Sequence, residues 1–490
     1  MATSTVAAMG GDGDARGATQ LKYNGTGATG ANPLEMDVNI WYEPGDIAWM
    51  LASTALVLLM IPGVGFFYSG LARRKSALSL VWLSVMSASV TCFQWFFWGF
   101  SLTFSHTSGA FIGDLANFGF NDVLARPSVG SAHLPDMLFA VYQGMFSALT
   151  VALATGAVAE RGRMLPCVIF IFIWATVVYD PIACWTWNPN GWSNKMGVLD
   201  FAGGTPVHIA SGSAALAYSM MLGKRRGHGT HELNYRPHNA THIVTGTVFL
   251  WVGWFGFNAG SALAANLRGV MAALVTNLAA CVGGITWFAG LVCITPGSGY
   301  VPPWAAVIFG VLGASGSNYA TKVKFLLGID DALDIFAVHG VGGLIGNICT
   351  AFFASPSIAA LDGHSRINGG WIHHHWAQMG YQLADSFCGG LYSFSVTCLI
   401  LFIMNLIPGL RIRASEEAEI LGIDDAEIGE FAYDYVELTR EVVNDVEGEA
   451  GSRYSADPTA FHPYEKHSIP MIDARMFGGQ PPPAPMGFPQ

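Results

Sequence analysis

Charged residues are scarce in this 490-residue chain, because Asp, Glu, Lys and Arg together make up only 12% of it. Soluble globular proteins carry about 25% charged residues, so the composition excludes an ordinary soluble domain. Hydrophobic residues make up 52% of the chain, which predicts an all-α protein that crosses a membrane many times. The net charge of −11 is misleading, because 13 acidic residues lie between Glu416 and Glu449. The apolar composition predicts membrane lipid as a partner, and nothing in the sequence suggests nucleic acid.

Patterns typical of metal, disulfide and secretory sequences are also missing. The eight cysteines lack the paired spacing of a zinc site or disulfide framework, and most lie in apolar runs as small core residues. The run from His373 to His375 is interpreted as an ordinary extracellular loop rather than a metal site. The first 40 residues lack the apolar core of a cleavable signal peptide, although Asn24 begins an Asn-Gly-Thr glycosylation triplet. No cofactor, metal or enzymatic activity is expected.

Long apolar runs divide the chain into three predicted parts. Residues 1–46 are expected to be an extracellular segment, residues 47–410 a transmembrane domain, and residues 411–490 a cytoplasmic tail that is disordered towards its end. A membrane-spanning helix needs about 20 mostly apolar residues. Ten runs meet this requirement, at residues 47–71, 77–104, 136–158, 165–185, 201–223, 242–265, 270–294, 301–319, 334–354 and 382–408.

The basic residues between the spans give two conflicting orientations. Arg73, Arg161 and Lys224 follow the first, third and fifth spans, and basic residues favour the cytoplasm, so the N-terminus is predicted to lie outside. Lys322 and Arg411 follow the eighth and tenth spans, which strict alternation would place outside. One more crossing between the seventh and eighth spans would restore the pattern. The roughly 27 residues there are too few for two full spans of about 20.

Two of the predicted spans carry the same unusual pattern. Asp200 precedes His208 by eight residues, and Asp331 precedes His339 by eight residues. Each histidine is followed by a run of small residues, which allows helices to approach closely. A pattern repeated in two distant spans is typical of transporters built from two inverted repeats, with the site at their interface. Ionisable residues inside a membrane usually mark a pathway.

Other interpretations of the histidines remain open at this point. Each could be a core histidine satisfied by a backbone carbonyl, and two facing histidines could hold a haem. The aromatic stretches between residues 141 and 261 suggest a pore wall, since aromatic faces attract small cations. No span carries a ring of carboxylates, which argues against a conventional aqueous cation channel.

Five long stretches of the sequence are distinctive: DFAGGTPVH, GWFGFNAGSA, DDALDIFAVHGVGG, YQGMFSALTVALATGAVAER and VYDPIACWTW. They resemble the ammonium transporter family (Amt/Mep/Rh), and most of all its fungal Mep-type high-affinity permeases. The resemblance runs from about Ile47 to Glu437.

The resemblance implies an inverted five-helix repeat with eleven spans, a homotrimer in the plasma membrane, and ammonium or ammonia as substrate. Family members have two spans where this chain has one, so the resemblance implies that about twenty residues are missing near 285–295. The resemblance also implies roles for the residues of this sequence that match the family's motifs by position. Trp187, Phe146, Ser261 and Asp200 match an outer ammonium-binding site; Phe146, Phe257 and Tyr142 match a gate; His208 and His339 match a twin-histidine pore.

The resemblance also leaves two functions open. One is transport, in which ammonium is captured, deprotonated and conducted as ammonia, with net proton movement. The alternative is an ammonium sensor that signals through the cytoplasmic tail. In that tail, Ser452 and Ser455 are candidate sites for a regulatory kinase.

Asp200→Ala should abolish the uptake of methylammonium, an ammonium analogue, in cells that lack other carriers. The reason is that the variant removes the carboxylate expected to support the bound cation. Uptake near the wild-type rate would contradict the cation-capture role of Asp200.

Overall fold

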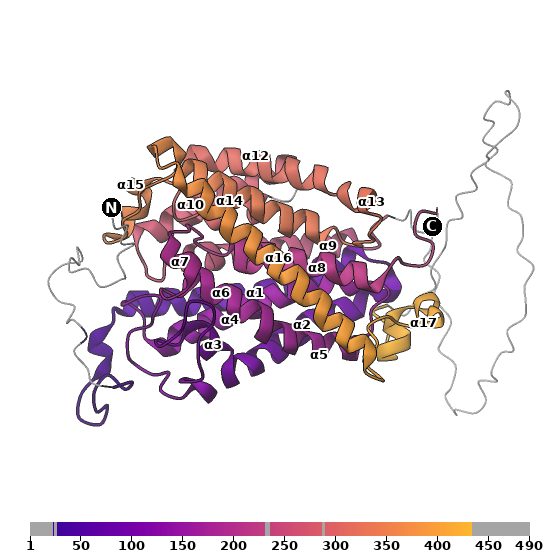
Figure 1. Cartoon of the computed structure of the whole chain (residues 1–490), viewed down its shortest axis with the longest axis horizontal. Helices are drawn as coiled ribbons and strands as arrows, with labels where there is room; N and C mark the ends of the chain where they lie inside the picture. The colour runs from indigo at the N-terminus through magenta and orange to yellow at the C-terminus, as the bar shows by residue number, and fades with distance from the viewer. Residues whose placement is uncertain (1–22, 24–26, 231–235, 287–289, 434–490) are drawn as a thin grey trace, which may run out of the picture. The chain divides into compact units, whose positions relative to one another are not determined.

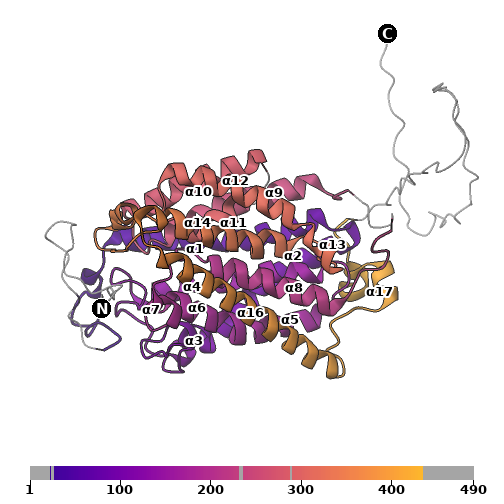
Figure 2. The same ribbon diagram turned by 45° about the horizontal axis from the view of Figure 1, so that its top comes forward.

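The structure is a computed structural model, and it describes residues 23, 27–230, 236–286, 290–433. Within these residues the secondary structure is helical, with two isolated β-bridges and no β-strand. The long helices run alongside one another (Figures 1 and 2). The short helices α7 (Trp192–Met196) and α15 (Pro356–Ala359) lie near one end, and α17 (Glu416–Leu421) lies at the other (Figure 1). The all-α fold expected from the composition is therefore confirmed.

Nine of the ten predicted spans each coincide with one helical stretch, whereas the span predicted at 270–294 contains two separate helices, Leu267–Thr286 and Gly290–Ile294. Eight helical stretches of the described residues are long and apolar enough to cross a membrane. The predicted spans at 201–223 and 301–319 also form helices, but they are richer in glycine, serine and other polar residues than the eight. The main helices are α1 (Pro44–Leu71), α2 (Ala77–Gln94), α3 (Phe100–Phe104), α4 (Asp136–Thr155), α5 (Met164–Trp174), α6 (Asp180–Trp187), α8 (Ala210–Leu222), α9 (Ala240–Trp254), α10 (Leu267–Thr286), α11 (Gly290–Ile294), α12 (Pro303–Ala320), α14 (Gly342–Phe353) and α16 (Ala377–Leu406).

Short π-helical segments continue or precede several of these helices. In a π-helix the backbone hydrogen bonds join residues five apart, and such segments occur frequently at functional sites. They are η3 (Trp95–Gly99), η6 (Ala175–Tyr179), η7 (Gly204–Ile209), η9 (Phe255–Ala259) and η11 (Phe336–Val341).

Polar contacts between loops define the two ends of the bundle. At the first, here called the Asp46 end, the Asp46 carboxylate accepts a hydrogen bond from the Ala265 amide at 2.7 Å. At the second, here called the Arg225 end, Arg225 forms ion pairs with Glu160 and Asp330. Successive helices run between these ends in alternating directions, as the positions of the loops require.

The short helix α11 resolves the conflict between the basic residues. Arg268, at the start of α10, donates from Nε to the Gly299 carbonyl at 2.8 Å and lies over the Tyr300 ring. The chain that leaves the Asp46 end in α10 is therefore back at that end by Gly299. Val275 of α10 and Cys293 of α11 share one buried cluster, so α11 packs beside α10. The chain makes an additional, shortened return there, beyond the ten full spans.

This return fixes the relative direction of the two histidine-bearing helices. The helix η7–α8 runs from the Asp46 end to the Arg225 end, whereas η11–α14 begins beside Asp330 and returns. The Ser355 amide, just after α14, donates to the Tyr300 carbonyl at the Asp46 end. The two helices are thus antiparallel, as the inverted repeat requires.

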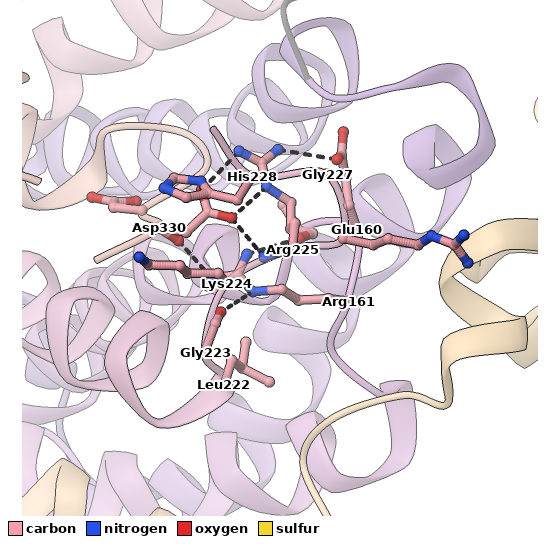
Figure 3. Close-up of polar contacts among 12 residues, drawn as sticks. Glu160, Arg161, Leu222, Gly223, Lys224, Arg225, Gly227, His228 and Asp330 are labelled. Carbon is pink, nitrogen blue, oxygen red and sulfur yellow. Dashed lines mark hydrogen bonds and ion pairs between the residues drawn. The ribbon is translucent and has the colours of Figure 1, made fainter. Parts of the chain in front are cut away.

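A buried ionic cluster joins four loops at the Arg225 end (Figure 3). Arg225 donates to Asp330 Oδ2 at 2.8 Å and to Glu160 Oε2 at 3.0 Å, and Arg73 also binds Glu160 at 2.8 Å. Arg225 is 9% exposed, while Glu160 and Asp330 are 2% exposed. Burial alone would raise the pKa of Asp330, but the hydrogen bonds and charge of Arg225 hold that pKa below its usual range.

Arg161 is fully buried in the same cluster and binds backbone carbonyls. It donates to Gly223 O at 2.9 Å, to Ala159 O at 3.3 Å and to Asp330 O at 2.5 Å (Figure 3). Burial lowers the pKa of Arg161 to about 10, so the guanidinium stays charged at neutral pH. Arg161 therefore ties together the loops that precede α5, follow α8 and precede η11.

The tail docks on the Arg225 end through acidic side chains. The Asp424 carboxylate accepts hydrogen bonds from the Leu78 and Ser79 amides at 2.9 and 2.8 Å, at the start of α2. Glu427 accepts from the Met164 amide at 3.2 Å, at the start of α5, and pairs with Arg163. The first amides of a helix have no partner within that helix, so tail residues complete two helices of the bundle.

Arg225→Met should destabilise the protein by about 3–5 kcal/mol, because it leaves the buried carboxylates of Glu160 and Asp330 without this partner. The measurement is the thermal melting of detergent-solubilised protein. Arg226→Met is the matched control, since its pair with Glu416 is 52% and 72% exposed and such pairs contribute at most about 1 kcal/mol. Equal melting temperatures for the two variants would contradict the stabilising role of the buried cluster.

Candidate transport site

The two histidines predicted to face each other are in direct contact. His208 Nδ1 lies 3.1 Å from His339 Nδ1, and the rings are stacked at 16° with centroids 5.3 Å apart. His208 is 1% exposed and His339 is 7% exposed. Each lies in a π-helical segment, His208 in η7 and His339 in η11. The sequence repeat thus corresponds to a repeated backbone conformation.

Each aspartate of the repeat caps the segment that carries its histidine. Asp200 accepts hydrogen bonds from the amides of Gly203, Gly204 and Thr205 at 2.7–2.8 Å. Asp331 accepts from the Phe336 amide at 2.9 Å. Because the first amides of a helix need acceptors, each aspartate fixes the start of its segment and thereby the position of its histidine.

Glycines allow the two histidine-bearing helices to touch. A Cβ atom on Gly212 would lie 2.2 Å from the Gly340 amide nitrogen, and one on Gly343 would lie 3.1 Å from the His208 Cβ. Only glycine fits at such distances without moving backbone. The small-residue runs predicted to permit close approach therefore lie at the helix contact itself.

The predicted aromatic residues form one cluster towards the Asp46 end of the histidine pair. The Phe146 and Phe257 rings stack with centroids 4.1 Å apart, and Trp187 packs edge-on against Phe146 at 5.8 Å. The Tyr142 hydroxyl donates to the carbonyl of Phe257 at 3.1 Å and lies 3.4 Å from the Ser261 hydroxyl. The structure therefore brings together four aromatic residues and one serine, namely Tyr142, Phe146, Trp187, Phe257 and Ser261. They come from α4, α6, η9 and the turn that follows η9.

The aromatic cluster is continuous with both Asp200 and the histidines. Trp187 Nε1 donates to the Asp200 carbonyl at 3.1 Å. The Phe257 ring lies 6.2 Å from the His208 ring, centroid to centroid. A single path of contacts therefore runs from Asp200 through Trp187, the stacked phenylalanines and His208 to His339.

Two residues that contact His208, Trp254 and Thr295, were not predicted from the sequence. Trp254 stacks on the His208 ring at 5.9 Å, and its Nε1 donates to the Thr295 hydroxyl at 3.1 Å. The same hydroxyl lies 3.4 Å from His208 Nε2. Thr295 follows the shortened return helix α11, and no spacing pattern in the sequence relates it to His208.

Three candidate modification sites cannot be placed in this structure. Asn24, Ser452 and Ser455 lie outside the described residues.

Gly212→Ala should impair transport of methylammonium, because the added methyl group forces the helices of His208 and His339 apart. Overpacking of this kind typically costs about 1–3 kcal/mol, so both uptake and melting temperature should fall. Gly380→Ala in α16 is the control, since nothing lies within 4 Å of its Cβ position. Wild-type uptake by the Gly212 variant would contradict the need for close contact.

Comparison with known proteins places this geometry in a family. The family model described as "Ammonium Transporter Family" matches residues 48–288 and 288–433. The two matched segments meet at residue 288, within the region predicted to be shortened. They cover most of the chain, including every described residue of the candidate site.

Individual relatives agree with the family match. Ammonium transporter 1 of Schizosaccharomyces pombe is 59% identical over 437 residues, covering 85% of this chain and 88% of that protein. Ammonium transporter MEP2 of Saccharomyces cerevisiae is 47% identical, covering 84% and 89%. The crystal structure of Candida albicans Mep2 matches with a TM-score of 0.76 at 47% identity, covering 81% of this chain and 91% of that one. This chain therefore belongs to the ammonium transporter family.

Proposed function

We propose that this chain transports ammonium across the plasma membrane by binding the cation, removing a proton and conducting ammonia past the histidine pair. The observation that carries the proposal is the contact between His208 Nδ1 and His339 Nδ1 at 3.1 Å inside the bundle. Burying two imidazoles in an apolar interior costs free energy. Ionisable residues inside a membrane usually mark a functional site, which favours a role for this pair in transport. The family membership and the names of the relatives support ammonium as the substrate.

The outer site is assigned to Trp187, Phe146, Ser261 and Asp200. The faces of Trp187 and Phe146 attract a small cation through their π-electrons, and the Ser261 hydroxyl provides a hydrogen-bond acceptor. The Asp200 carboxylate adds a buried negative charge, since it is 6% exposed. An ammonium ion suits this combination because it is both a cation and a hydrogen-bond donor.

The stacked Phe146 and Phe257 rings, with Tyr142 beside them, serve as the gate. At a centroid separation of 4.1 Å the rings leave no space between them, so one must rotate for substrate to pass. Moving a cation through this apolar constriction is far more costly than moving neutral ammonia. Loss of a proton before the gate therefore selects ammonium over metal cations, which have no proton to lose.

The histidine pair guides ammonia through the pore and relays the proton that ammonium has lost. In a neutral pair one Nδ1 donates to the other, which accepts, and the two roles are interchangeable. Such a pair relays a proton along a path separate from that of ammonia, which gives net proton movement. The Thr295 hydroxyl beside His208 Nε2 extends the polar path on one side.

The remaining assignments concern the membrane and the assembly. The Arg225 end, rich in basic residues, is assigned to the cytoplasm and the Asp46 end to the outside. The chain is assigned to a homotrimer, with exposed apolar helix faces against lipid or other subunits. Asn24 is assigned as a glycosylation site, and Ser452 and Ser455 as sites for a regulatory kinase.

An ammonium sensor is the second candidate function. The observation that favours it is the docking of Asp424 and Glu427 at the starts of α2 and α5. Because the tail completes helices of the bundle, its docking depends on the conformation of the bundle. A change in that conformation can therefore alter the state of the tail. Transport and sensing are compatible in one protein.

His208→Ala should abolish methylammonium uptake in cells that lack other carriers, because the proton relay loses one imidazole. The amount of protein at the cell surface, measured through an epitope tag, serves as the control for folding. Uptake at the wild-type rate with normal surface protein would overturn the transport mechanism. An uptake-dead variant that still triggers an ammonium-dependent cellular response would support the sensor.

A further inference from the structure

One face of α16 carries buried polar side chains although the helix is otherwise apolar. Gln382 and Asp385 are fully buried, and Gln378 and Ser386 are 3% and 2% exposed. Their spacing of three to four residues places them on one side of the helix. Buried polar residues inside a membrane are usually functional, and the proposed transport mechanism does not yet use this face.

The face fixes the loop that carries Asp200. Gln382 Nε2 donates to the Leu199 carbonyl at 2.8 Å, and Gln382 Oε1 accepts from the Leu199 amide at 2.7 Å. Gln378 donates to the Gly197 carbonyl at 3.0 Å. The backbone immediately before Asp200 is therefore held against α16.

Asp385 lies directly behind the proposed outer site. Its Oδ1 accepts hydrogen bonds from the hydroxyls of Thr186, at 3.2 Å, and Ser193. Thr186 immediately precedes Trp187, whose indole donates to the Asp200 carbonyl. The other carboxylate oxygen of Asp385, Oδ2, is buried and has no hydrogen-bond partner.

A second set of hydrogen bonds links Asp200 to Ser386, the residue that follows Asp385. Asn347 Nδ2 donates to the hydroxyls of Thr205, at 2.9 Å, and Ser386, at 2.8 Å. The Thr205 amide in turn donates to Asp200 Oδ2 at 2.7 Å. Asp200 and Asp385 are thus parts of one buried polar cluster.

Asp385 differs from the buried aspartates at the ends of the bundle in having no basic partner. Asp136 pairs with Arg126, and Asp330 pairs with Arg225. Among the described residues, Asp385 has no ion-pair partner, and its contacts are with the hydroxyls of Thr186, Ser193 and Thr205. A buried carboxylate without a cationic partner favours its protonated form, whereas a bound cation nearby favours ionisation. An ionised Asp385 and a cation in the outer site therefore stabilise each other.

We propose that Asp385 is a second acid of the outer ammonium site, which sets its affinity by adding negative potential behind Trp187 and Asp200. Asp385 does not touch the substrate. It acts through its charge, and it also helps to position Trp187 through Thr186. This inference rests on the proposed transport function.

Asp385→Asn should raise the apparent KM for methylammonium about tenfold, the size expected for one unit charge at close range in a partly dry site. The maximal rate should change much less, because the gate and the histidines are untouched. The amide of asparagine retains an oxygen that can accept from Thr186 and Ser193. An unchanged KM would overturn the proposal.

Two further variants separate charge from structure. Asp385→Glu retains the charge and should give a KM much closer to wild type than Asp385→Asn does. A purely structural role predicts the reverse, because glutamate is larger and fits less well. If Asp385→Asn does not reach the membrane, a KM for Asp385→Glu far above the wild-type value would overturn the proposal.

Asp180→Asn is the matched control for removing a buried membrane aspartate. Asp180 is fully buried and binds Gln94 at 2.7 Å, but it lies about two helical turns along α6 from Trp187. The apparent KM of the Asp180→Asn variant for methylammonium should stay close to the wild-type value. An equal rise in KM for Asp180→Asn and Asp385→Asn would overturn a specific role for Asp385. Absence of uptake by the wild-type chain would instead overturn the proposed function itself.

Discussion

The contact between His208 and His339 is the constraint on which the arrangement of this protein depends. Each imidazole is buried, and each needs a hydrogen-bond partner that the apolar surroundings do not supply. They serve as partners for each other at 3.1 Å, which requires two helices to cross with glycine at the contact. In this antiparallel arrangement the pair therefore depends on the absence of a side chain at Gly212, where a Cβ atom would lie 2.2 Å from the Gly340 amide nitrogen.

The antiparallel course depends in turn on features far from the histidines. The shortened return through α11 brings the chain back to the Asp46 end, so that η11–α14 enters from the Arg225 end. There, Arg161 and Arg225 bind the backbone and side chain of Asp330, next to the aspartate that caps η11. The ionic cluster thus anchors the start of the segment that carries His339.

Much of this organisation could be predicted from the sequence, because it follows from local patterns. The apolar runs located the long helices of the bundle but merged α10 and α11 into one span, and the conflict between Lys322 and the earlier basic residues located this irregular region. The repeated spacing of Asp200–His208 and Asp331–His339 identified the pair that the structure brings together. The resemblance supplied the aromatic residues, which do form one cluster.

Other features could not be predicted, since they arise from contacts between distant segments. The π-helical conformation of η7 and η11 leaves no mark on hydrophobic periodicity. Thr295 is 87 residues from His208 in the chain, and Asp385 is 199 residues from Thr186. Such pairs depend on how the helices pack, and a single sequence carries no record of that packing.

The helix-capping carboxylates of the tail have a thermodynamic consequence. While Asp424 and Glu427 are docked, three amides of α2 and α5 have acceptors, and undocking exposes those donors again. Tail release and any rearrangement of these helix ends are therefore linked equilibria, and each shifts the other by the same free energy. A modification that weakens docking would loosen two helices at the Arg225 end of the bundle, one of which leads through α6 to Trp187 at the far side of the bundle.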